Sequence, residues 1–201
     1  MENHELTHWG IKGQKWGHRR YQNKDGSLTP AGEKRYAKEE ANAQKLERKV
    51  EKKYAKAGRK IGAADYERSE GDKAYEQHDK AASAFDKSAK KYEKEGNYFK
   101  AEASRRAAEA IRSRGSNIRK SHYETADSYM KRSAKLTEKA NKFATKKKVD
   151  MGKSKVDAIL KNAKEQGYKN AKEIAEFQKE WEIVQRYGST AREAYDYARG
   201  K

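Results

Sequence analysis

The sequence contains no cysteine, a single proline and no long apolar run. Without cysteine, a disulfide framework, a thiolate nucleophile and a Cys-based zinc site are all excluded. No apolar run approaches the roughly 18–20 residues that a membrane span requires. The first residues lack the apolar region of a signal peptide. We therefore expect no membrane partner and no secretion by a signal peptide, so the protein should stay in the cytosol where it is made.

Large apolar side chains are also scarce. Only 34% of the residues are hydrophobic, 40% are charged, and the mean hydropathy is −1.40. Many of the apolar residues are alanine, which buries little area, at about 25 cal/mol per Å² of apolar surface. Alanine, lysine, glutamate, glutamine and arginine nevertheless favour helix strongly. The composition predicts thin, elongated all-α packing, completed by a partner or by association into a homo-oligomer.

The chain carries a large excess of positive charge. There are 49 Lys and Arg against 31 Asp and Glu, giving a formal net charge of +18. This excess is more than solubility requires and indicates a polyanionic partner. Residues 1–30 and 150–201 each carry a net charge of +2, which leaves +14 on residues 31–149. We expect the anion to bind to that middle segment.

Pro30 marks the main boundary of the chain. Residues 1–29 are rich in Gly, Trp, His and Arg without a helical period, which predicts an irregular leader. Thr29 suits the N-cap of a helix, and Pro30 suits its first position, where the backbone amide would be unpaired anyway. The predicted helix extends to about residue 57, and Gly58, Gly62 and Gly71 are candidate breaks.

Residues 30–149 are predicted to form a long-helix hairpin that resembles a coiled coil. A stripe at Ala74, Ala81, Phe85, Ala89 and Tyr92 predicts a helix over 74–92. Gly96 then suits the end of that helix, and Asn97 suits the N-cap of the next. A near-heptad pattern predicts one helix over 98–147, packed against the 74–95 helix or against another copy. Its seam residues are Ala101, Ala108, Ile111, Gly115, Ile118, His122, Tyr129, Leu136, Ala140 and Phe143.

Residues 150–201 have the pattern of a small C-terminal helical bundle. Three N-capping residues each stand three positions before an acidic residue. Two glycines stand where helices would end. We therefore predict three short helices over 155–166, 171–187 and 190–199. The capping pairs are Ser154 with Asp157, Asn170 with Glu173, and Thr190 with Glu193, and the two glycines are Gly167 and Gly188.

The leader combines glycine, tryptophan and basic side chains. Exposed Trp beside Lys and Arg suits stacking, cation–π contact or insertion into a partner's groove. The alternative is that both tryptophans cap the helical core, and residue chemistry alone supports the two interpretations equally. The candidate partner-docking residues are Trp9, Gly10, Lys12, Gly13, Lys15, Trp16, Gly17, Arg19, Arg20 and Tyr21.

Residues 8–36 contain a distinctive series of short motifs, which are Trp9-Gly10-Ile11-Lys12-Gly13, Lys15-Trp16-Gly17, Arg19-Arg20-Tyr21, Asp25-Gly26-Ser27-Leu28-Thr29-Pro30-Ala31-Gly32 and Arg35-Tyr36. This series resembles a recurrent N-terminal motif of proteins from phages and prophages of Gram-positive bacteria. Two residues depart from the pattern, since Gln14 replaces a usual Met and His18 replaces a small aliphatic residue. The resemblance implies phage provenance and association with virion or capsid proteins, and it implies no reaction.

Nothing in the sequence indicates catalysis, a cofactor or a metal. There is no glycine-rich phosphate loop, no nucleophile elbow and no His-x-x-x-His pair with a glutamate on a predicted helix. His4 and His8 are four residues apart, but they belong to the leader, which has no helical period. No Cys and only the scattered carboxylates of Glu2 and Glu5 join His4, His8 and His18, whereas a zinc site takes four ligands of suitable spacing. His78 and His122 fall on predicted helix seams. Lys146, Lys147 and Lys148 are candidate phosphate-binding residues, although cations also complement a helix C-terminus.

These observations support three functional hypotheses. The first is a non-enzymatic virion-associated phage protein, whether minor structural, scaffold-like or internal to the head. It would bind DNA or an acidic protein surface, and would reside in the host cytoplasm during infection and in the particle. The second is a nucleic-acid-binding protein of the infected cell that contacts the phosphate backbone. The third is an inhibitor of a host anti-phage defence complex.

Overall fold

The computed structural model describes residues 21–23 and 25–187, and these residues contain three helices. These are α1 (Pro30–Lys94), α2 (Tyr98–Lys147) and α3 (Lys153–Tyr187). The described residues contain no strand beyond the isolated bridge between Gln22 and Leu28, so the predicted all-α class is confirmed. Among the described helices, none combines the length and the apolar character that a membrane crossing demands. The chain divides into two units, Met1–Arg48 and Lys49–Lys201, and α1 contributes to both.

In the first unit, a tight turn precedes α1. The Asp25 carboxylate accepts hydrogen bonds from the Ser27 amide (3.0 Å) and hydroxyl (2.7 Å). These bonds lower the pKa of Asp25, and the bond from the Ser27 hydroxyl contributes most. Gly26 takes the left-handed conformation (φ +88°), which costs glycine little. The Thr29 amide then donates to the Tyr21 carbonyl at 3.2 Å, so the turn folds the chain back on itself just before the helix.

The predicted start of α1 is confirmed. The Thr29 hydroxyl accepts a hydrogen bond from the Gly32 amide at 3.1 Å, and Pro30 is the first helical residue. Gly32 lies so close to the Tyr21 carbonyl that a Cβ atom would collide with it. The Arg35 guanidinium lies 4.7 Å from the centre of the Tyr21 ring. The residues from Tyr21 to Arg35 that carry the phage resemblance therefore build a local turn and helix cap.

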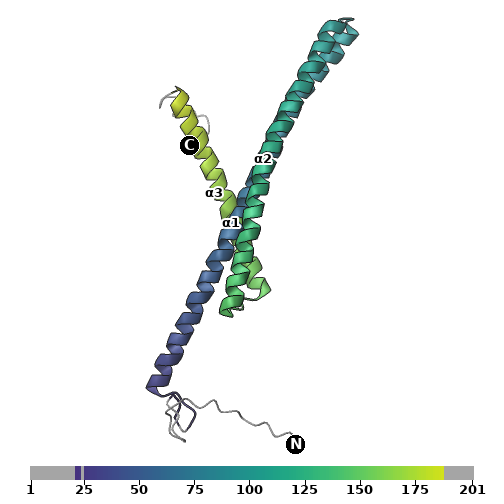
Figure 1. Cartoon of the computed structure of the whole chain (residues 1–201). Coiled ribbons are helices and arrows are strands. Elements are labelled where there is room, and N and C mark those ends of the chain that lie inside the picture. Colours follow the sequence, from purple (N-terminus) through teal and green to yellow (C-terminus); the bar gives the residue numbers. More distant parts are fainter. Residues whose placement is uncertain (1–20, 24, 188–201) are drawn as a thin grey trace, which may run out of the picture. The chain divides into compact units, whose positions relative to one another are not determined.

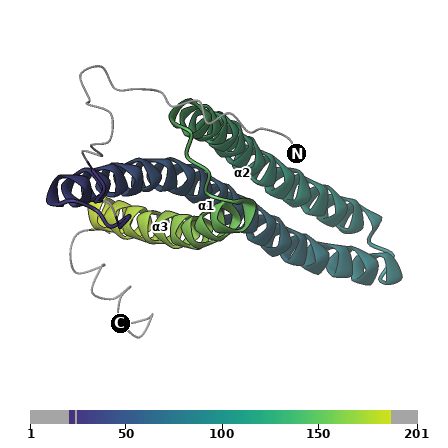
Figure 2. The ribbon, with the colours of Figure 1, turned by 90° about the horizontal axis from the view of Figure 1, so that it is seen from below.

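In the second unit, α1 and α2 form an antiparallel hairpin, and Figures 1 and 2 show them side by side. The predicted turn is confirmed, because Gly96 is left-handed (φ +73°) and the Asn97 side chain accepts from the Lys100 amide at 3.2 Å. The helix predicted over 98–147 is confirmed as well. The predicted breaks at Gly58, Gly62 and Gly71 are wrong, because α1 is continuous through all three.

Small residues line the seam between α1 and α2. On α2 the buried positions are Ala101, Ala108, Gly115, Ala126, Ser133 and Ala140, spaced by seven except for one step of eleven. On α1 they include Ala57, Ala64, Gly71, Ala82 and Ala89, with the same single step of eleven. The predicted seam thus missed Ala126 and Ser133. On α1 it is wrong at Ala81 and Phe85, which are exposed, while the adjacent Ala82 is buried.

The third helix runs parallel to α1 and crosses it at glycines. Lys155 binds Glu51 at 3.2 Å, and further along both helices Lys164 binds Asp65 at 2.7 Å. A Cβ atom on Gly58 would lie 2.7 Å from the Leu160 carbonyl oxygen, and one on Gly62 or Gly167 would collide with the opposing backbone. The helix α3 continues through Gly167, so the separate short helices predicted over 155–166 and 171–187 are wrong. Gly188 and the helix predicted over 190–199 lie outside the described residues.

Where α3 begins, all three helices share a small apolar core. Val50, Tyr54 and Ala140 are buried there, and Tyr54 also donates a hydrogen bond to the Asn141 side chain at 2.6 Å. This core fixes the open end of the α1–α2 hairpin. The partly buried residues packed around it are Phe143, Ala144, Val149, Met151, Val156, Ile159 and Leu160.

Candidate nucleic-acid interface

The positive charge of the second unit is concentrated at the open end of the hairpin. Residues 49–60 of α1 carry six Lys and Arg against one acid, and residues 128–148 carry eight against one. The two segments pack together, because the Ser133 hydroxyl donates to the Ala57 carbonyl at 3.0 Å and Val50 clusters with Ala140. Together they place a net charge of +12 on one part of the molecule.

Five lysines form a regular stripe on α2 within this region, here called the lysine face. They follow one another at steps of four, four, three and four residues, which keeps them on one side of a helix. That side lies opposite the buried Ser133 and Ala140, and all five are exposed. The lysine face consists of Lys131, Lys135, Lys139, Lys142 and Lys146.

Most of the lysine face forms no ion pair with the part of the chain that the structure describes. Within the described residues, Lys142 alone among the five forms a salt bridge, to Glu138 at 2.6 Å. Their hydrogen bond lowers the pKa of Glu138 and raises that of Lys142. At 1.5 Å per residue, the 15 steps from Lys131 to Lys146 span about 22 Å, which corresponds to about six phosphates of one DNA strand. The lysine face therefore has the charge and the length to follow a phosphate backbone.

At the other end of the hairpin, three α2 arginines are held by α1 acids in an ion-pair ladder. Arg119 binds Asp72 at 2.8 Å, and Arg105 pairs with Glu93. Between them, Arg112 bridges Asp79 (2.9 Å) and Asp86 (2.6 Å), and the bond to Asp86 contributes most to raising the pKa of Arg112. These four acids repeat every seven residues, as charged positions beside a coiled-coil seam do. The ladder arginines are thus engaged within the fold.

Two further cations of the basic end lie over aromatic rings. The Lys53 ammonium is 5.0 Å from the centre of the Phe143 ring, and the Lys60 ammonium is 5.0 Å from that of Tyr129. Such contacts pack the lysine stems against α2 while the charge stays near the surface. They add positive potential beside the lysine face without using an acidic partner.

The structure separates the three lysines that the sequence grouped together as a phosphate site. Lys146 and Lys147 belong to the last turn of α2. Lys148 lies beyond it in the left-handed conformation (φ 52°), with its amide bonded to the Thr145 carbonyl at 3.1 Å. Only Lys146 continues the lysine face. The rest of that face was missed, although its spacing of three and four residues was visible in the sequence.

Most of the predicted docking residues lie outside the described part of the chain. These are Trp9, Gly10, Lys12, Gly13, Lys15, Trp16, Gly17, Arg19 and Arg20. Tyr21 is described, and its carbonyl and ring take part in the turn before α1. The docking role of the leader stays a prediction.

The two described histidines lie in the hairpin seam, as predicted. The Cβ of His78 faces Gly115, and that of His122 faces Gly71. His122 Nδ1 lies 2.7 Å from Glu67, and His78 Nδ1 lies 2.8 Å from the Ala74 carbonyl. Across residues 21–23 and 25–187, no three His, Asp or Glu side chains gather in a way that would hold a metal ion.

Comparisons with protein-family models, with curated proteins and with solved structures find no match.

Proposed function

We propose that this chain is a non-enzymatic, virion-associated phage protein that binds the backbone of nucleic acid through the lysine face. The observation that carries the proposal is the division of charge along the hairpin. Residues 65–94 of α1 carry seven Lys and Arg against eight acids, and the ladder engages the facing arginines. The open end keeps a net charge of +12 and four lysines of the lysine face without salt bridges in the described residues.

The chemistry of the lysine face favours phosphate contact without sequence readout. Lysine is a point cation that binds phosphate without the planar two-pronged geometry of arginine. A row made only of lysines offers the same cationic donors at every position, without the mixture of donors and acceptors that distinguishes one base pair from another. Affinity should therefore come from counterion release and depend steeply on salt.

Association with the virion is the part of the proposal that the N-terminal resemblance supports. In this interpretation the leader, with Trp9 and Trp16 as anchors, docks onto a capsid or other virion protein. The lysine face then points to packaged nucleic acid. Mass spectrometry of purified phage particles tests this part. A fixed copy number supports it, whereas absence from the particles overturns it and favours a nucleic-acid-binding protein of the infected cell.

Fluorescence anisotropy with labelled duplex DNA over a salt series tests the nucleic-acid contact. The variant Lys131→Gln/Lys135→Gln/Lys139→Gln/Lys146→Gln should bind more weakly. The slope of log K against log salt should flatten by up to about 3.6, since each phosphate contact contributes about 0.9. The matched control is Lys80→Gln/Lys87→Gln/Lys90→Gln/Lys94→Gln, which removes four exposed α1 lysines nearer the hairpin turn. A flat salt dependence of the wild type, or equal losses in both variants, overturns the proposal.

A further inference from the structure

The C-terminal half of α3 exposes large apolar side chains. Ile174, Phe177 and Trp181 are 58%, 60% and 55% exposed. Their spacing of three and four residues places them on one stripe of the helix. The Phe177 and Trp181 rings stack on each other, with centres 6.5 Å apart and planes 16° from parallel. Such a stripe, here called the α3 stripe, is costly to leave in water and marks an interaction surface.

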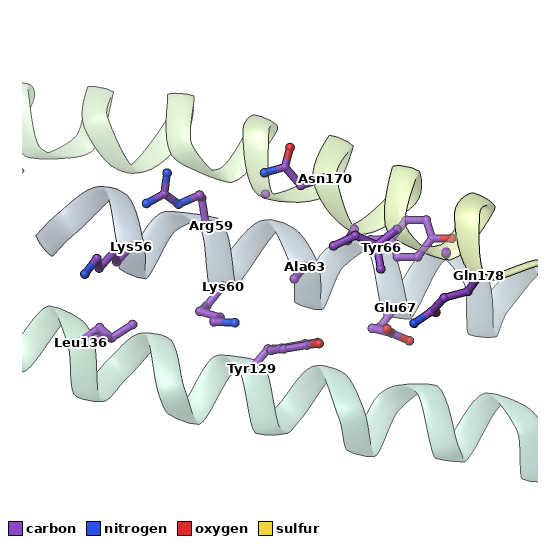
Figure 3. A pocket seen from close by; sticks show the side chains of 14 residues that line it. Lys56, Arg59, Lys60, Ala63, Tyr66, Glu67, Tyr129, Leu136, Asn170 and Gln178 are labelled. Carbon is purple, nitrogen blue, oxygen red and sulfur yellow. The ribbon is translucent and has the colours of Figure 1, made fainter. Parts of the chain in front are cut away.

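A trough lies beside the α3 stripe, between α2 and α3, with α1 as its floor (Figure 3). It consists of two adjoining cavities of about 460 and 410 Å³ that share Tyr66, Glu67, Ala175 and Gln178. Along α1 the lining extends from Lys56 to Gln77, which is about 32 Å at 1.5 Å per residue. The trough therefore has the length of a helix of about twenty residues. Its far wall includes Tyr129, Leu136 and His122 of α2.

One end of the trough and the segment of α3 that carries the α3 stripe have opposite charge. Three cations, Lys56, Arg59 and Lys60, line one end of the trough. By contrast, residues 173–182 of α3 carry four glutamates against one lysine. Among these acids, Glu173 and Glu182 are exposed, and their helical positions flank the α3 stripe on its two sides. The rest of the trough's lining contains both signs of charge, including Glu67, Glu70 and Lys73. An acid-flanked apolar helix is thus complementary to the basic end of the trough.

We propose that the occupant of the trough is α3 from a second copy of this chain. The two surfaces lie next to each other on one molecule, so a two-fold axis satisfies both at once. With the two α3 helices antiparallel, the Glu182 end of each approaches the Lys56 end of the other's trough. The α3 stripes meet face to face near the axis, which buries two Phe177–Trp181 ring pairs. A different protein would have to supply both complementary features by itself.

The sedimentation behaviour of the full-length protein in the absence of nucleic acid tests the dimer. The wild type should sediment as a dimer at micromolar concentration. The variant Phe177→Ser/Trp181→Ser should sediment as a monomer with unchanged helix content by circular dichroism. The matched control is Tyr98→Ser/Phe99→Ser, which removes aromatics that are 74% and 86% exposed and should remain dimeric. A monomeric wild type overturns the proposal and points to residues 188–201 or to another protein as the occupant.

Charge reversal tests the pairing of the two surfaces. Glu173→Lys/Glu182→Lys and Lys56→Glu/Arg59→Glu should each weaken the dimer at least tenfold, and the combined variant should restore it. If each charge reversal weakens the dimer but the combined variant does not restore it, the proposed docking is overturned.

Cross-linking tests the position of the two-fold axis. Because the chain has no cysteine, Gln178→Cys gives a single thiol near the proposed axis. A short thiol cross-linker should join that variant, and should leave Ser116→Cys on α2 uncross-linked. Both readouts are independent of nucleic-acid binding, so failure of the dimer is distinguishable from failure of the proposed function.

Discussion

Gly115 of α2 lies directly against His78 of α1, and a Cβ atom on Gly115 would stand 2.6 Å from the His78 Cβ. The same contact occurs in reverse nearby, where a Cβ on Gly71 of α1 would stand 2.9 Å from the His122 Cβ of α2. Each helix thus places one histidine over a glycine of the other. The two contacts adjoin the steps of eleven residues in the seam, so they fix the register of the hairpin where its heptad spacing changes.

The first prediction concerns this contact. Replacing an exposed helical glycine with alanine usually raises the free energy of unfolding by about 0.5–1 kcal/mol. Gly115→Ala should instead lower the free energy of unfolding by about 1–3 kcal/mol, because the added methyl overpacks the seam. Urea unfolding measures the effect. The control Ser116→Ala changes an exposed neighbour and should be neutral or stabilising. In a double-mutant cycle, His78→Gly should reduce the cost of Gly115→Ala, and strict additivity would contradict the steric explanation.

Local chemistry made a large part of this fold predictable from sequence. The caps at Thr29 and Asn97 and the full extent of α2 follow from side chains within a few residues of each feature. The predicted helix ends at the glycines were wrong because the role of these residues depends on a contact with another helix. Gly58 and Gly167 disfavour helix locally, but they allow two helices to approach closely, and tertiary contact overrides propensity.

The candidate site shows the same division between local and tertiary information. The spacing of the lysine face is local, and it could have been recognised from the sequence. The engagement of Arg112 could not, because its partners Asp79 and Asp86 are on another helix. Only the hairpin register separates structural arginines from exposed lysines, and in the sequence both resemble solvated helix faces.

The second prediction concerns the crossing of α1 and α3. A Cβ atom on Gly62 would collide with the Lys164 carbonyl, which belongs to the backbone and cannot rotate away. Gly62→Ala should therefore displace α3 from α1, with a cost of about 1–3 kcal/mol. Hydrogen exchange should show loss of protection across α3 with protection retained in α2 near Arg112. Equal loss in both helices would mean that α3 is not separately docked, and unchanged exchange would contradict the close approach.

The third prediction concerns the ion-pair ladder. Arg112→Glu places a carboxylate between Asp79 and Asp86 and should lower the melting temperature by a few degrees at low salt, on the order of 2–4 °C. The loss should shrink as salt rises, because exposed charges are screened. Asp79→Arg in the same chain should recover part of it. The control Arg114→Glu reverses a neighbouring exposed cation that makes no salt bridge in the described residues, and a drop of the same size there would assign the effect to net charge.

The last prediction concerns alkaline stability. Tyr66 is buried, with a ring centre 5.6 Å from that of Tyr168. Burial, reinforced by the negative charges of Glu70 and Glu67, raises the pKa of Tyr66 from 10.0 to about 12. Between those values the unfolded chain has already lost the phenol proton that the folded chain retains. The free energy of unfolding must therefore fall as the pH rises through this range, and this contribution is fully present only below about pH 10.

Urea unfolding at pH 9 to 12 measures this loss, and the free energy of unfolding should fall less steeply for Tyr66→Phe than for the wild type. Tyr98→Phe, at a ring that is 74% exposed, is the matched control; a Tyr66→Phe curve parallel to the wild type would show that the buried phenol does not cause the loss.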